Sequence, residues 1–451
     1  SAPAKGHAVA EYMRPTELGE QLQSMLMSYV DARFPAADAA NLSAFERERF
    51  RHYAFARELR RVYVADESVM QELDAHASSN TGSPLAIVAE HGSGKSALLA
   101  HWCELYRQHH PEVALVEHYV GSTSSGSAVP NILRRVMLEV QAQLGDSTDD
   151  IPNDDDQLIS VLPQWLSATL DRNDASRVVI VLDALNAIDA RGNAHELRWL
   201  PSTFPSAVRV VVSTTPSSKT AEACQQHDWR TLELLPMPVA KRVSLLREYL
   251  STSSKRLSGP QEQRIASANA AGNPRYLRVL LDHLTVSAQF DDLTSTIERS
   301  LRATTTADLY ALVLARLEND FDGGGGGATA TTTTTTATPS KIVENALGLI
   351  LASRRGLSVQ DELLPLLGMD DDEATWNDVA NSLEGELLEF SGLVNFANAD
   401  FRTAVQQRYA ATDGKQRALH ARLASFFAKR AAAGGGGGGG GGVGGGGGGG
   451  R

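Results

Sequence analysis

The residues best suited to chemistry in this chain form a short loop in which two glycines precede a lysine and a serine. The loop reads Gly92-Ser93-Gly94-Lys95-Ser96. Glycine lets a backbone turn its N–H groups inward around phosphate oxygens, and the start of a following helix adds a positive end. In such a loop Lys95 would reach the β- and γ-phosphates of a nucleotide, while the Ser96 hydroxyl would join the coordination shell of Mg²⁺. The pattern therefore predicts a phosphate-binding loop.

The segments on either side of the loop have the patterns that such a loop needs. The apolar run 85–89 is typical of a buried parallel strand, and a helix-forming stretch continues from Ala97, which we include among the nucleotide-binding residues. Ala89 occupies the position of a further glycine in the strict pattern, at the strand end rather than against the phosphates. An ordinary strand-turn-helix junction is the alternative. The Gly-x-Gly-Lys-Ser string would arise by chance in a chain of this length only about once in a hundred sequences, which favours phosphate binding.

Two polar residues follow apolar runs further along the chain. Asp183 ends the run 177–182, which is where a phosphate-loop fold places the carboxylate that holds Mg²⁺ through water. Alone, Asp183 would be interpreted as a strand cap, but together with the loop it favours the metal role. Ser213 follows the run 208–212, and two roles stay open for it: sensing the γ-phosphate or forming a turn. Since the carboxyl ends of parallel strands meet at one sheet edge, we expect Ala89, Asp183 and Ser213 to converge there, with Lys95 close to Asp183.

Apolar runs without polar alternation, separated by helical patterns, indicate an α/β fold with a parallel sheet covered by helices on both faces. Further strands are expected over 113–116 and 231–234, and the pattern after residue 235 is wholly helical. The expected organisation is a helical segment over 1–80, a P-loop NTPase domain over 81–235, a helical lid domain over 236–322, a Gly/Thr low-complexity linker over 323–340, a winged-helix domain over 341–431 and a disordered polyglycine tail over 432–451.

Helical spacing defines several elements within these segments. In the first segment it falls on Leu22, Met25, Leu26 and Tyr29. Asn273 and Pro274 have the residue types of a helix N-cap and of a first helical position, which predicts a helix that begins there. In the winged-helix domain, helices are expected over 342–351, 358–367 and 376–388, with a strand over 393–396 and two closing helices.

Composition excludes several classes of protein. The formal net charge of −12 argues against a general binder of nucleic acids, whose affinity comes from clustered Lys and Arg. The expected winged-helix domain is acidic too, with 10 Lys and Arg against 13 Asp and Glu.

Cys103 and Cys224 lack the spacing of a zinc site, and we interpret them as packed small hydrophobes. No apolar run approaches the roughly 20 residues of a bilayer span, and the start has no signal-peptide core. These features predict a cytoplasmic protein, and the polyglycine end suggests a piece of a longer one.

Several strings of residues are similar to a known group of proteins. Val179-Ile180-Val181-Leu182-Asp183-Ala184-Leu185-Asn186, followed by Leu197-Arg198-Trp199-Leu200-Pro201, resembles nephrocystin-3-like members of the STAND class of signalling ATPases, a class that includes NACHT proteins. Gly272-Asn273-Pro274-Arg275-Tyr276-Leu277 resembles the helical-domain motif of this family. The similarity extends over residues 50–430.

The resemblance implies a fold and a mode of action. It implies an ASCE-type nucleotide domain, a helical lid and a winged helix that close together over ATP or ADP, with Pro274 packed on the adenine ring. Exchange and hydrolysis would switch the protein between resting and assembly-competent states, the latter a nucleotide-dependent homo-oligomer. Protein partners would bind a repeat array, often of tetratricopeptide type, after the winged helix. Polyglycine stands in that place here.

Four residues depart from the family pattern. Asn186 and Ala187 stand where many STAND proteins carry acidic residues that orient the attacking water. Asp66 stands where related ATPases have an arginine that contacts the nucleotide. Asn398 stands where relatives have a histidine that reads the β-phosphate, and asparagine donates a hydrogen bond without carrying charge. These departures speak against rapid turnover more than against binding.

The sequence therefore leaves three hypotheses. The first is an ATP-binding STAND-type signalling switch with slow or partner-stimulated, Mg²⁺-dependent hydrolysis, in which Lys95 and Asp183 are catalytic. The second is a nucleotide-binding scaffold without hydrolysis, suggested by Asn186 and Ala187. The third is a DNA-directed ATPase, which rests on the winged helix alone and is opposed by its charge.

Overall fold

The computed structural model describes residues 24–25, 28, 42–123, 126–146, 148, 150–173, 177–252, 255–287, 293–322, 341–369, 372–383, 385–390 and 392–434. The chain divides into two compact units, Ser1–Ala54 and Phe55–Arg451, and α3 (Ala44–Leu59) runs across the division. Three predictions lie outside the described residues: most of the apolar spacing around Leu22, the linker over 323–340, and the polyglycine from residue 435 onward.

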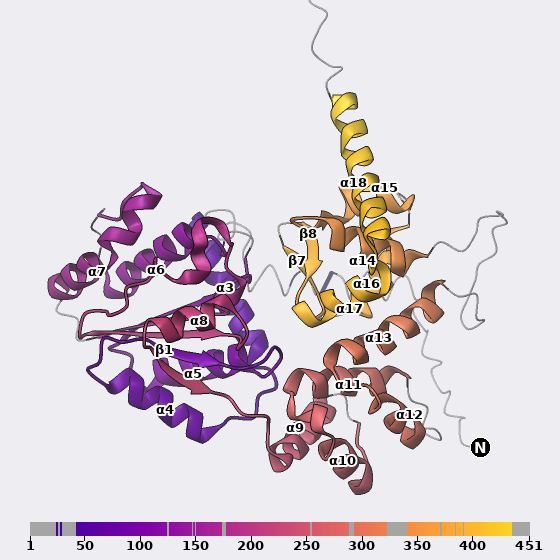
Figure 1. The fold of residues 1–451 in the computed structure, drawn as a ribbon, viewed down its shortest axis with the longest axis horizontal. Coiled ribbons are helices and arrows are strands. Elements are labelled where there is room, and N and C mark those ends of the chain that lie inside the picture. The colour runs from indigo at the N-terminus through magenta and orange to yellow at the C-terminus, as the bar shows by residue number, and fades with distance from the viewer. Residues whose placement is uncertain are drawn as a thin grey trace, which may run out of the picture. The chain divides into compact units, whose positions relative to one another are not determined.

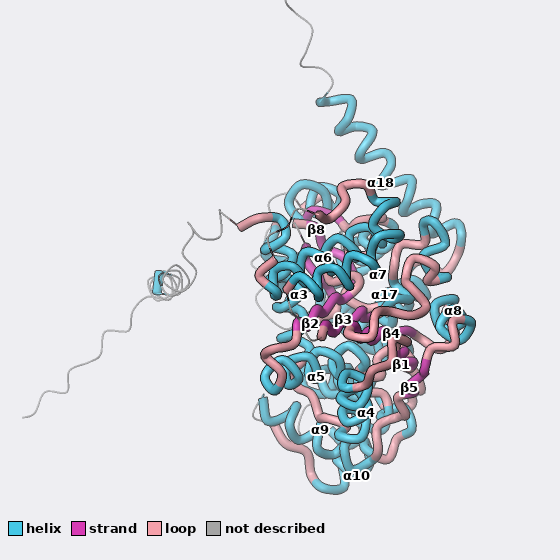
Figure 2. The backbone as a smooth tube through the Cα atoms, turned by 90° about the vertical axis from the view of Figure 1, so that its left-hand side faces the viewer, coloured by secondary structure: helices cyan, strands magenta, loops and turns pink. Residues whose placement is uncertain are grey.

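Five parallel strands form the sheet that the sequence predicts. In space they follow the order β2-β3-β4-β1-β5 (Figure 2). Their bounds are β1 (Leu85–Val88), β2 (Ala114–Tyr119), β3 (Val178–Asp183), β4 (Val208–Thr214) and β5 (Arg230–Glu233). β1 pairs with β4 on one side and with β5 on the other. The loop that follows β1 therefore leaves the sheet between two neighbouring strands, as a ligand-binding loop in a parallel sheet does.

β2 continues to Tyr119, beyond the predicted end at residue 116. Glu117 and His118 end the apolar run, yet both are buried in the strand. Arg107 donates a hydrogen bond to Glu117 Oε1 at 2.9 Å, and His118 Nε2 lies 2.8 Å from Gly126 O. A hydropathy pattern misses such residues because other segments supply their polar partners.

Helices cover both faces of this sheet (Figure 1). They are α4 (Glu67–Ser78), α5 (Lys95–His109), α6 (Val129–Leu144), α7 (Asp155–Arg172) and α8 (Lys219–Gln226). On β3, Val179 and Val181 belong to one apolar cluster with α4 and α5, whereas Val178, Ile180 and Leu182 belong to another with α6, α7 and α8. The alternation along a single strand confirms a sheet that is buried on both sides.

The two cysteines lie inside these clusters. Cys103 is on α5 and Cys224 on α8, and both side chains are fully buried and unpaired. Burial raises the pKa of the Cys103 thiol well above its usual range and that of Cys224 to about 12. Their interpretation as packed small hydrophobes is confirmed.

After β5 the described chain is helical up to residue 322 and then combines helices with a small sheet. The first group contains α9 (Val239–Thr252), α10 (Gly259–Ala266), α11 (Pro274–Ser287), α12 (Leu293–Ser300), α13 (Thr306–Leu317) and a π-helical turn at Glu318–Asp322. The second contains α14 (Ile342–Ala352), a π-helical turn at Val359–Leu363, α15 (Leu364–Leu367), α16 (Glu373–Asn381), α17 (Ala399–Tyr409) and α18 (Asp413–Gly434). Its antiparallel strands β6 (Leu357–Ser358), β7 (Leu387–Phe390) and β8 (Leu393–Phe396) lie in the order β6-β8-β7.

The helix predicted over 376–388 is wrong in its second half. α16 ends at Asn381, and Leu387 and Leu388 belong to β7, which pairs with β8. Gly385, with φ of +82°, makes the turn between helix and strand. The apolar residues after 381 fit a helical stripe as well as a short strand, and the pairing with β8 decides between them.

The helices of 239–317 and the elements after residue 341 share one apolar cluster. It includes Tyr276 and Leu277 of α11, Tyr310 of α13 and Phe401 of α17, none of them more than 1% exposed. Among the helices of the described residues, none has both the length and the apolar character needed to cross a bilayer.

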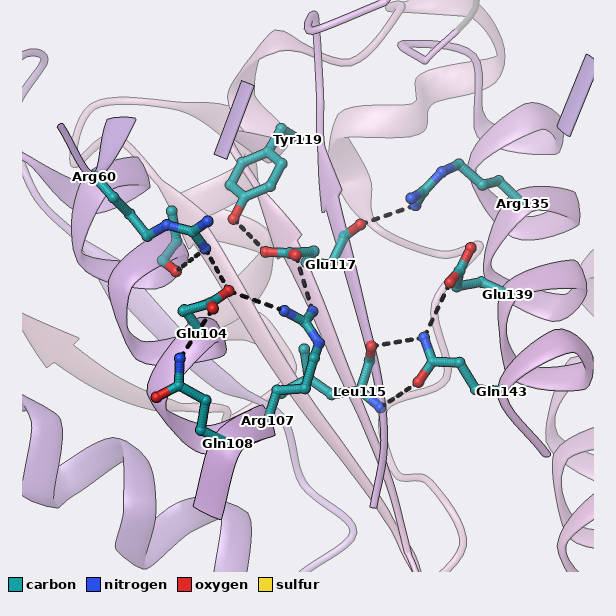
Figure 3. Close-up of polar contacts among 11 residues, drawn as sticks. Arg60, Glu104, Arg107, Gln108, Leu115, Glu117, Tyr119, Arg135, Glu139 and Gln143 are labelled. Carbon is teal, nitrogen blue, oxygen red and sulfur yellow. Dashed lines mark hydrogen bonds and ion pairs between the residues drawn. The ribbon is translucent and has the colours of Figure 1, made fainter. Parts of the chain in front are cut away.

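Side chains of α6 close the outer edge of β2. Within the described sheet β2 pairs only with β3, so its other edge has backbone groups without a strand partner. Gln143 Nε2 donates to Leu115 O and Gln143 Oε1 accepts from Leu115 N, both at 2.9 Å (Figure 3). Arg135 donates to Glu117 O at 2.9 Å. The Gln143 amide thus takes the place of a neighbouring strand.

We predict that Gln143→Leu destabilises the protein, because the buried N–H and C=O of Leu115 lose their partner. An unsatisfied buried polar group costs about 1–3 kcal/mol. Urea unfolding followed by circular dichroism measures the loss. Gln108→Leu is the matched control, since Gln108 is exposed and bonds to Glu104 on its own helix, and its effect is expected to stay within about 0.5 kcal/mol. Equal losses in the two variants would contradict the role given to Gln143.

Candidate functional site

The loop between β1 and α5 has the backbone of a tight, glycine-dependent turn. The predicted order of strand, loop and helix is confirmed, with β1 ending at Val88, one residue before the end of the predicted run, and α5 beginning at Lys95, two residues before Ala97. Gly92 and Gly94 have φ of +73° and +95°, in the region that side chains disfavour. Both glycines are therefore needed where the phosphate-loop pattern places them.

The amine of Lys95 folds back over this loop. Lys95 is only 8% exposed, and its Nζ donates to Ala89 O at 2.6 Å and to Glu90 O at 2.9 Å. Burial lowers the pKa of Lys95, and the charges of Asp183, Glu90 and Asp400 oppose that shift. Among the described residues, Lys95 Nζ bonds to backbone carbonyls and to no carboxylate, so its charge is available to an anion.

Asp183 lies at the centre of a cluster of hydroxyl groups. It is the last residue of β3 and is 2% exposed. Its Oδ1 accepts a hydrogen bond from Ser213 Oγ at 2.5 Å, and the Ser96 side chain is a second hydrogen-bond partner. Burial raises the pKa of Asp183, whereas Ser213, Ser96 and Lys95 act to lower it. As expected, Lys95, Asp183 and Ser213 lie together at one edge of the sheet, and Ser96 lies there with them.

Ser213 connects the ends of β3 and β4. Besides donating to Asp183, its Oγ accepts a hydrogen bond from Ala184 N at 2.8 Å. The hydroxyl thus fixes the direction of the Asp183 carboxylate in this conformation. This positioning contact differs from the two roles left open for Ser213, and γ-phosphate sensing stays a prediction.

Two buried polar atoms at this site have no hydrogen-bond partner among the described residues. They are Ser93 Oγ in the loop and Asn186 Oδ1, which follows β3. Proteins rarely leave buried polar atoms unsatisfied without a reason. The Ser93 hydroxyl, with the loop glycines and the Lys95 amine, can donate to an anionic group such as a nucleotide phosphate, whereas Asn186 Oδ1 accepts and needs a donor such as water.

The start of α11 lies against the outer side of the loop. Asn273 Nδ2 donates to His91 O at 2.7 Å, and Arg275 N donates to Gly92 O at 3.2 Å. Pro274 Cγ is 3.7 Å from the position that a Cβ on Gly94 would occupy. The predicted site residue Pro274 is therefore brought to the loop. The contacts of Asn273 and Arg275 were not predicted, since the Asn-Pro pair indicates only a helix start.

Two of the residues that depart from the family pattern, Asp66 and Asn398, have other partners here. Asp66 pairs with Lys241 of α9 at 3.0 Å. Asn398 caps α17, where its Oδ1 accepts from Phe401 N at 2.8 Å, and its Nδ2 donates to Glu386. Both halves of the Asn398 amide are thus engaged within the C-terminal elements.

A magnesium ion at this site would depend on few protein ligands. In the described part of the chain, no group of three or more His, Cys, Asp and Glu residues gathers as a metal site. Ser96 and Asp183 are the predicted metal residues, and their side chains are hydrogen-bonded to each other. Such a pair suits Mg²⁺ that takes its remaining ligands from phosphate and water.

The amino-acid sequence is similar to several long proteins. A TPR repeat-containing protein of Dictyostelium discoideum is 29% identical over 478 residues, which cover 93% of this chain and 28% of that protein. Nephrocystin-3 of Mus musculus is 25% identical over 360 residues, covering 77% and 25%. Tetratricopeptide repeat protein 41 of Rattus norvegicus is 24% identical over 345 residues, covering 72% and 26%. The chain thus spans about a quarter of the length of these relatives.

No family model matches the chain. Solved structures with a detectable likeness include domain III of the replication initiation protein DnaA from Thermotoga maritima, with a TM-score of 0.33 and 13% identity over 54% of this chain and 95% of that one. The RuvB Holliday junction branch migration motor of Thermotoga maritima has a TM-score of 0.32 and 13% identity over 74% and 92%. Scores this low do not establish a shared fold, so the fold class rests on the strand order and the loop.

His118 holds the loop that follows β2 beside this site. Its ring is fully buried, with Nε2 2.8 Å from Gly126 O. At the start of the same loop, Val120 N donates to Asp183 O at 3.1 Å. Burial lowers the pKa of His118 to about 3, and the charge of Arg135 acts in the same direction.

We predict that the free energy of unfolding falls as the pH is lowered, and that this fall is smaller in His118→Gln. Histidine in an unfolded chain titrates near pH ~6.5, so below that value protons bind the unfolded chain in preference to the folded one. His118 thus contributes a loss of up to about 1.4 kcal/mol per pH unit as the pH falls from ~6.5 toward its folded-state pKa. Urea unfolding at several pH values between 7 and 4 measures the slope. The exposed His109→Gln is the control, and equal slopes in both variants would contradict the prediction.

Proposed function

We propose that this chain is the nucleotide-operated part of a STAND-type signalling switch that binds ATP or ADP with Mg²⁺. The observation that carries the proposal is the meeting of Lys95, Ser96 and Asp183 at one sheet edge, beside a loop whose glycines have positive φ. This arrangement supplies an amine, a hydroxyl and a carboxylate from separate segments. A nucleotide triphosphate with its metal is the ligand that uses all three.

Each residue has a defined role in this proposal. The loop of Gly92, Ser93 and Gly94, continued by Ala97 at the start of α5, would surround the phosphates with N–H groups. Lys95 would exchange the carbonyls of Ala89 and Glu90 for phosphate oxygens. Ser96 and Asp183 would hold Mg²⁺, which neutralises phosphate charge when bound. Ser213 would keep the Asp183 carboxylate oriented, and Pro274 would contact the nucleotide from α11.

Hydrolysis is proposed to be slow. Asn186 and Ala187 follow β3, in the positions from which an acidic residue would orient an attacking water. The buried Oδ1 of Asn186 can accept a hydrogen bond, but an amide is too weak a base to remove a proton from water. A partner that supplies the missing group would accelerate the reaction.

The C-terminal elements are proposed to form a helical lid over 236–322 and a winged helix over 341–431. The second assignment is supported by three short helices, α14, α15 and α16, with the antiparallel sheet β6-β8-β7. The relatives with tetratricopeptide names are far longer than this chain, and we propose that repeats after the winged helix bind protein partners. Two buried, unpaired cysteines fit a reducing compartment such as the cytoplasm.

A nucleotide-binding scaffold without hydrolysis is the second candidate, favoured by the amide at position 186. A DNA-directed ATPase is not favoured. α16, which would be the DNA-facing helix of a winged-helix domain, carries Glu373 and Asp378 and has neither Lys nor Arg.

Lys95→Ala is predicted to weaken Mg²⁺-ATP binding about 10-fold to 100-fold, since hydrogen bonds to a charged group contribute about 1.5–3 kcal/mol. Calorimetry measures the dissociation constant, and circular dichroism checks that the sheet remains folded. The exposed Lys219→Ala, at the start of α8, is the control and should bind like the parent. Unchanged binding in Lys95→Ala would show that the nucleotide site is elsewhere.

Asp183→Asn is predicted to abolish any Mg²⁺-dependent release of phosphate from ATP. The substitution removes the charge that would hold the metal while keeping the size of the side chain. Phosphate release is measured with and without Mg²⁺, with the exposed Asp171→Asn as the control. A parent protein that binds ATP but shows no Asp183-dependent release would support the scaffold over the switch.

A further inference from the structure

We propose that Asn273 is a positioning residue that joins the lid helix α11 to the phosphate loop and orients the loop's N–H groups. The contact itself is a feature of the structure, and its effect on nucleotide affinity rests on the function proposed above. Neither the helix-start pattern nor the family resemblance assigns this role to Asn273.

Asn273 uses both halves of its side-chain amide. Its Oδ1 accepts from Arg275 N at 3.0 Å and from Tyr276 N at 3.3 Å, which caps α11. Its Nδ2 donates to His91 O at 2.7 Å. Asparagine is suited to both tasks because one side chain carries an acceptor and a donor. Aspartate could cap the helix but could not donate to the loop.

Arg275 adds a second contact between the same two segments. Its backbone N–H donates to Gly92 O at 3.2 Å, next to the His91 carbonyl that Asn273 binds. Two consecutive carbonyls of the loop therefore face α11. The start of α11 is itself held in place, since Tyr276 is 1% exposed and its hydroxyl donates to Ala303 O at 2.8 Å.

Because peptide groups are planar, the contacts to the loop carbonyls also set the direction of the loop N–H groups. In a trans peptide the C=O of one residue and the N–H of the next point in opposite directions. With His91 O and Gly92 O turned toward α11, the N–H groups of Gly92 and Ser93 are turned away from it. Ser93 N donates to Glu90 O at 3.3 Å within the loop, a long hydrogen bond that a phosphate oxygen would replace. These are N–H groups that the proposed function assigns to phosphate, so α11 fixes their direction from the opposite side.

The close approach leaves no room for a side chain at position 92. A Cβ built on Gly92 would lie 2.7 Å from Arg275 Cβ and 2.7 Å from Asn273 Oδ1. Gly92 therefore serves two requirements, a positive φ and contact with α11. This second requirement explains why the loop and the lid helix fit together only with glycine at this position.

If docking of α11 favours the loop conformation that binds nucleotide, then docking and nucleotide binding must strengthen each other. Whatever docking of α11 adds to nucleotide affinity, bound nucleotide must add to the docking of α11. Bound nucleotide would thus affect the C-terminal elements in two ways, through the backbone of the loop and through direct contact.

The experiment compares Asn273→Ser with the parent protein in the full chain. Serine keeps a capping oxygen but is too short to replace the donor that reaches His91 O. Amide hydrogen exchange of residues 89–96 is measured without nucleotide, and the dissociation constant of Mg²⁺-ATP by calorimetry. We expect roughly fivefold faster exchange in the loop and roughly fivefold weaker binding, the effect of one neutral hydrogen bond. In the parent, Mg²⁺-ATP should slow exchange at Arg275 and Tyr276.

Two further variants keep the result interpretable. Asn273→Asp retains the cap and should also accelerate loop exchange, so it replaces the serine variant if that one fails to fold. Thr305→Ala removes the cap of α13, another lid helix, where Thr305 Oγ1 accepts from Asp308 N at 3.1 Å, and should leave loop exchange unchanged.

The possible results separate the inference from the proposed function. Loop exchange that is the same in Asn273→Ser and the parent overturns the positioning role, and so does tighter ATP binding in the variant. A parent protein that binds no ATP overturns the proposed function instead. In that case faster loop exchange in the variant still supports the contact between α11 and the loop.

Discussion

Two opposite charges with little access to water, the amine of Lys95 and the carboxylate of Asp183, constrain the structure around them. Burial disfavours the charged form of each, and each charge favours the other. They lie at the ends of different elements, so their proximity depends on the register of β1, β4 and β3. A slip of one residue in that register would turn Asp183 to the opposite face of the sheet. The register of the parallel sheet thus keeps Lys95 and Asp183 close together.

The groups that hydrogen-bond to Lys95 and Asp183 are uncharged. Ser96 and Ser213 bind the carboxylate, the carbonyls of Ala89 and Glu90 bind the amine, and α11 contacts the loop from outside. Neutral partners of this kind hold the geometry without adding a net charge. They also leave the amine available, since a phosphate oxygen is a stronger partner for it than a carbonyl.

Local patterns in the sequence were sufficient to predict the sheet, the loop and the residues that converge on it. The run that ends in Asp183 and the glycines before Lys95 are short signals that depend on neighbouring residues alone. Two features could not be predicted in this way. β2 continues through Glu117 and His118 because partners elsewhere in the chain satisfy them, and β7 forms because β8 lies beside it. The contact between Asn273 and His91 joins residues 182 positions apart, and no local pattern encodes it.

The closure of β2 by Gln143 and Arg135 limits how copies of this chain, or other proteins, can associate with it. At one border of the main sheet, Leu115 N, Leu115 O and Glu117 O already bond to side chains of α6, so an added strand would have to displace these contacts. The opposite border is β5, where Arg230 and Glu233 are exposed and place charges along the strand. Extension of the main sheet from one subunit into another is therefore disfavoured at both of its borders.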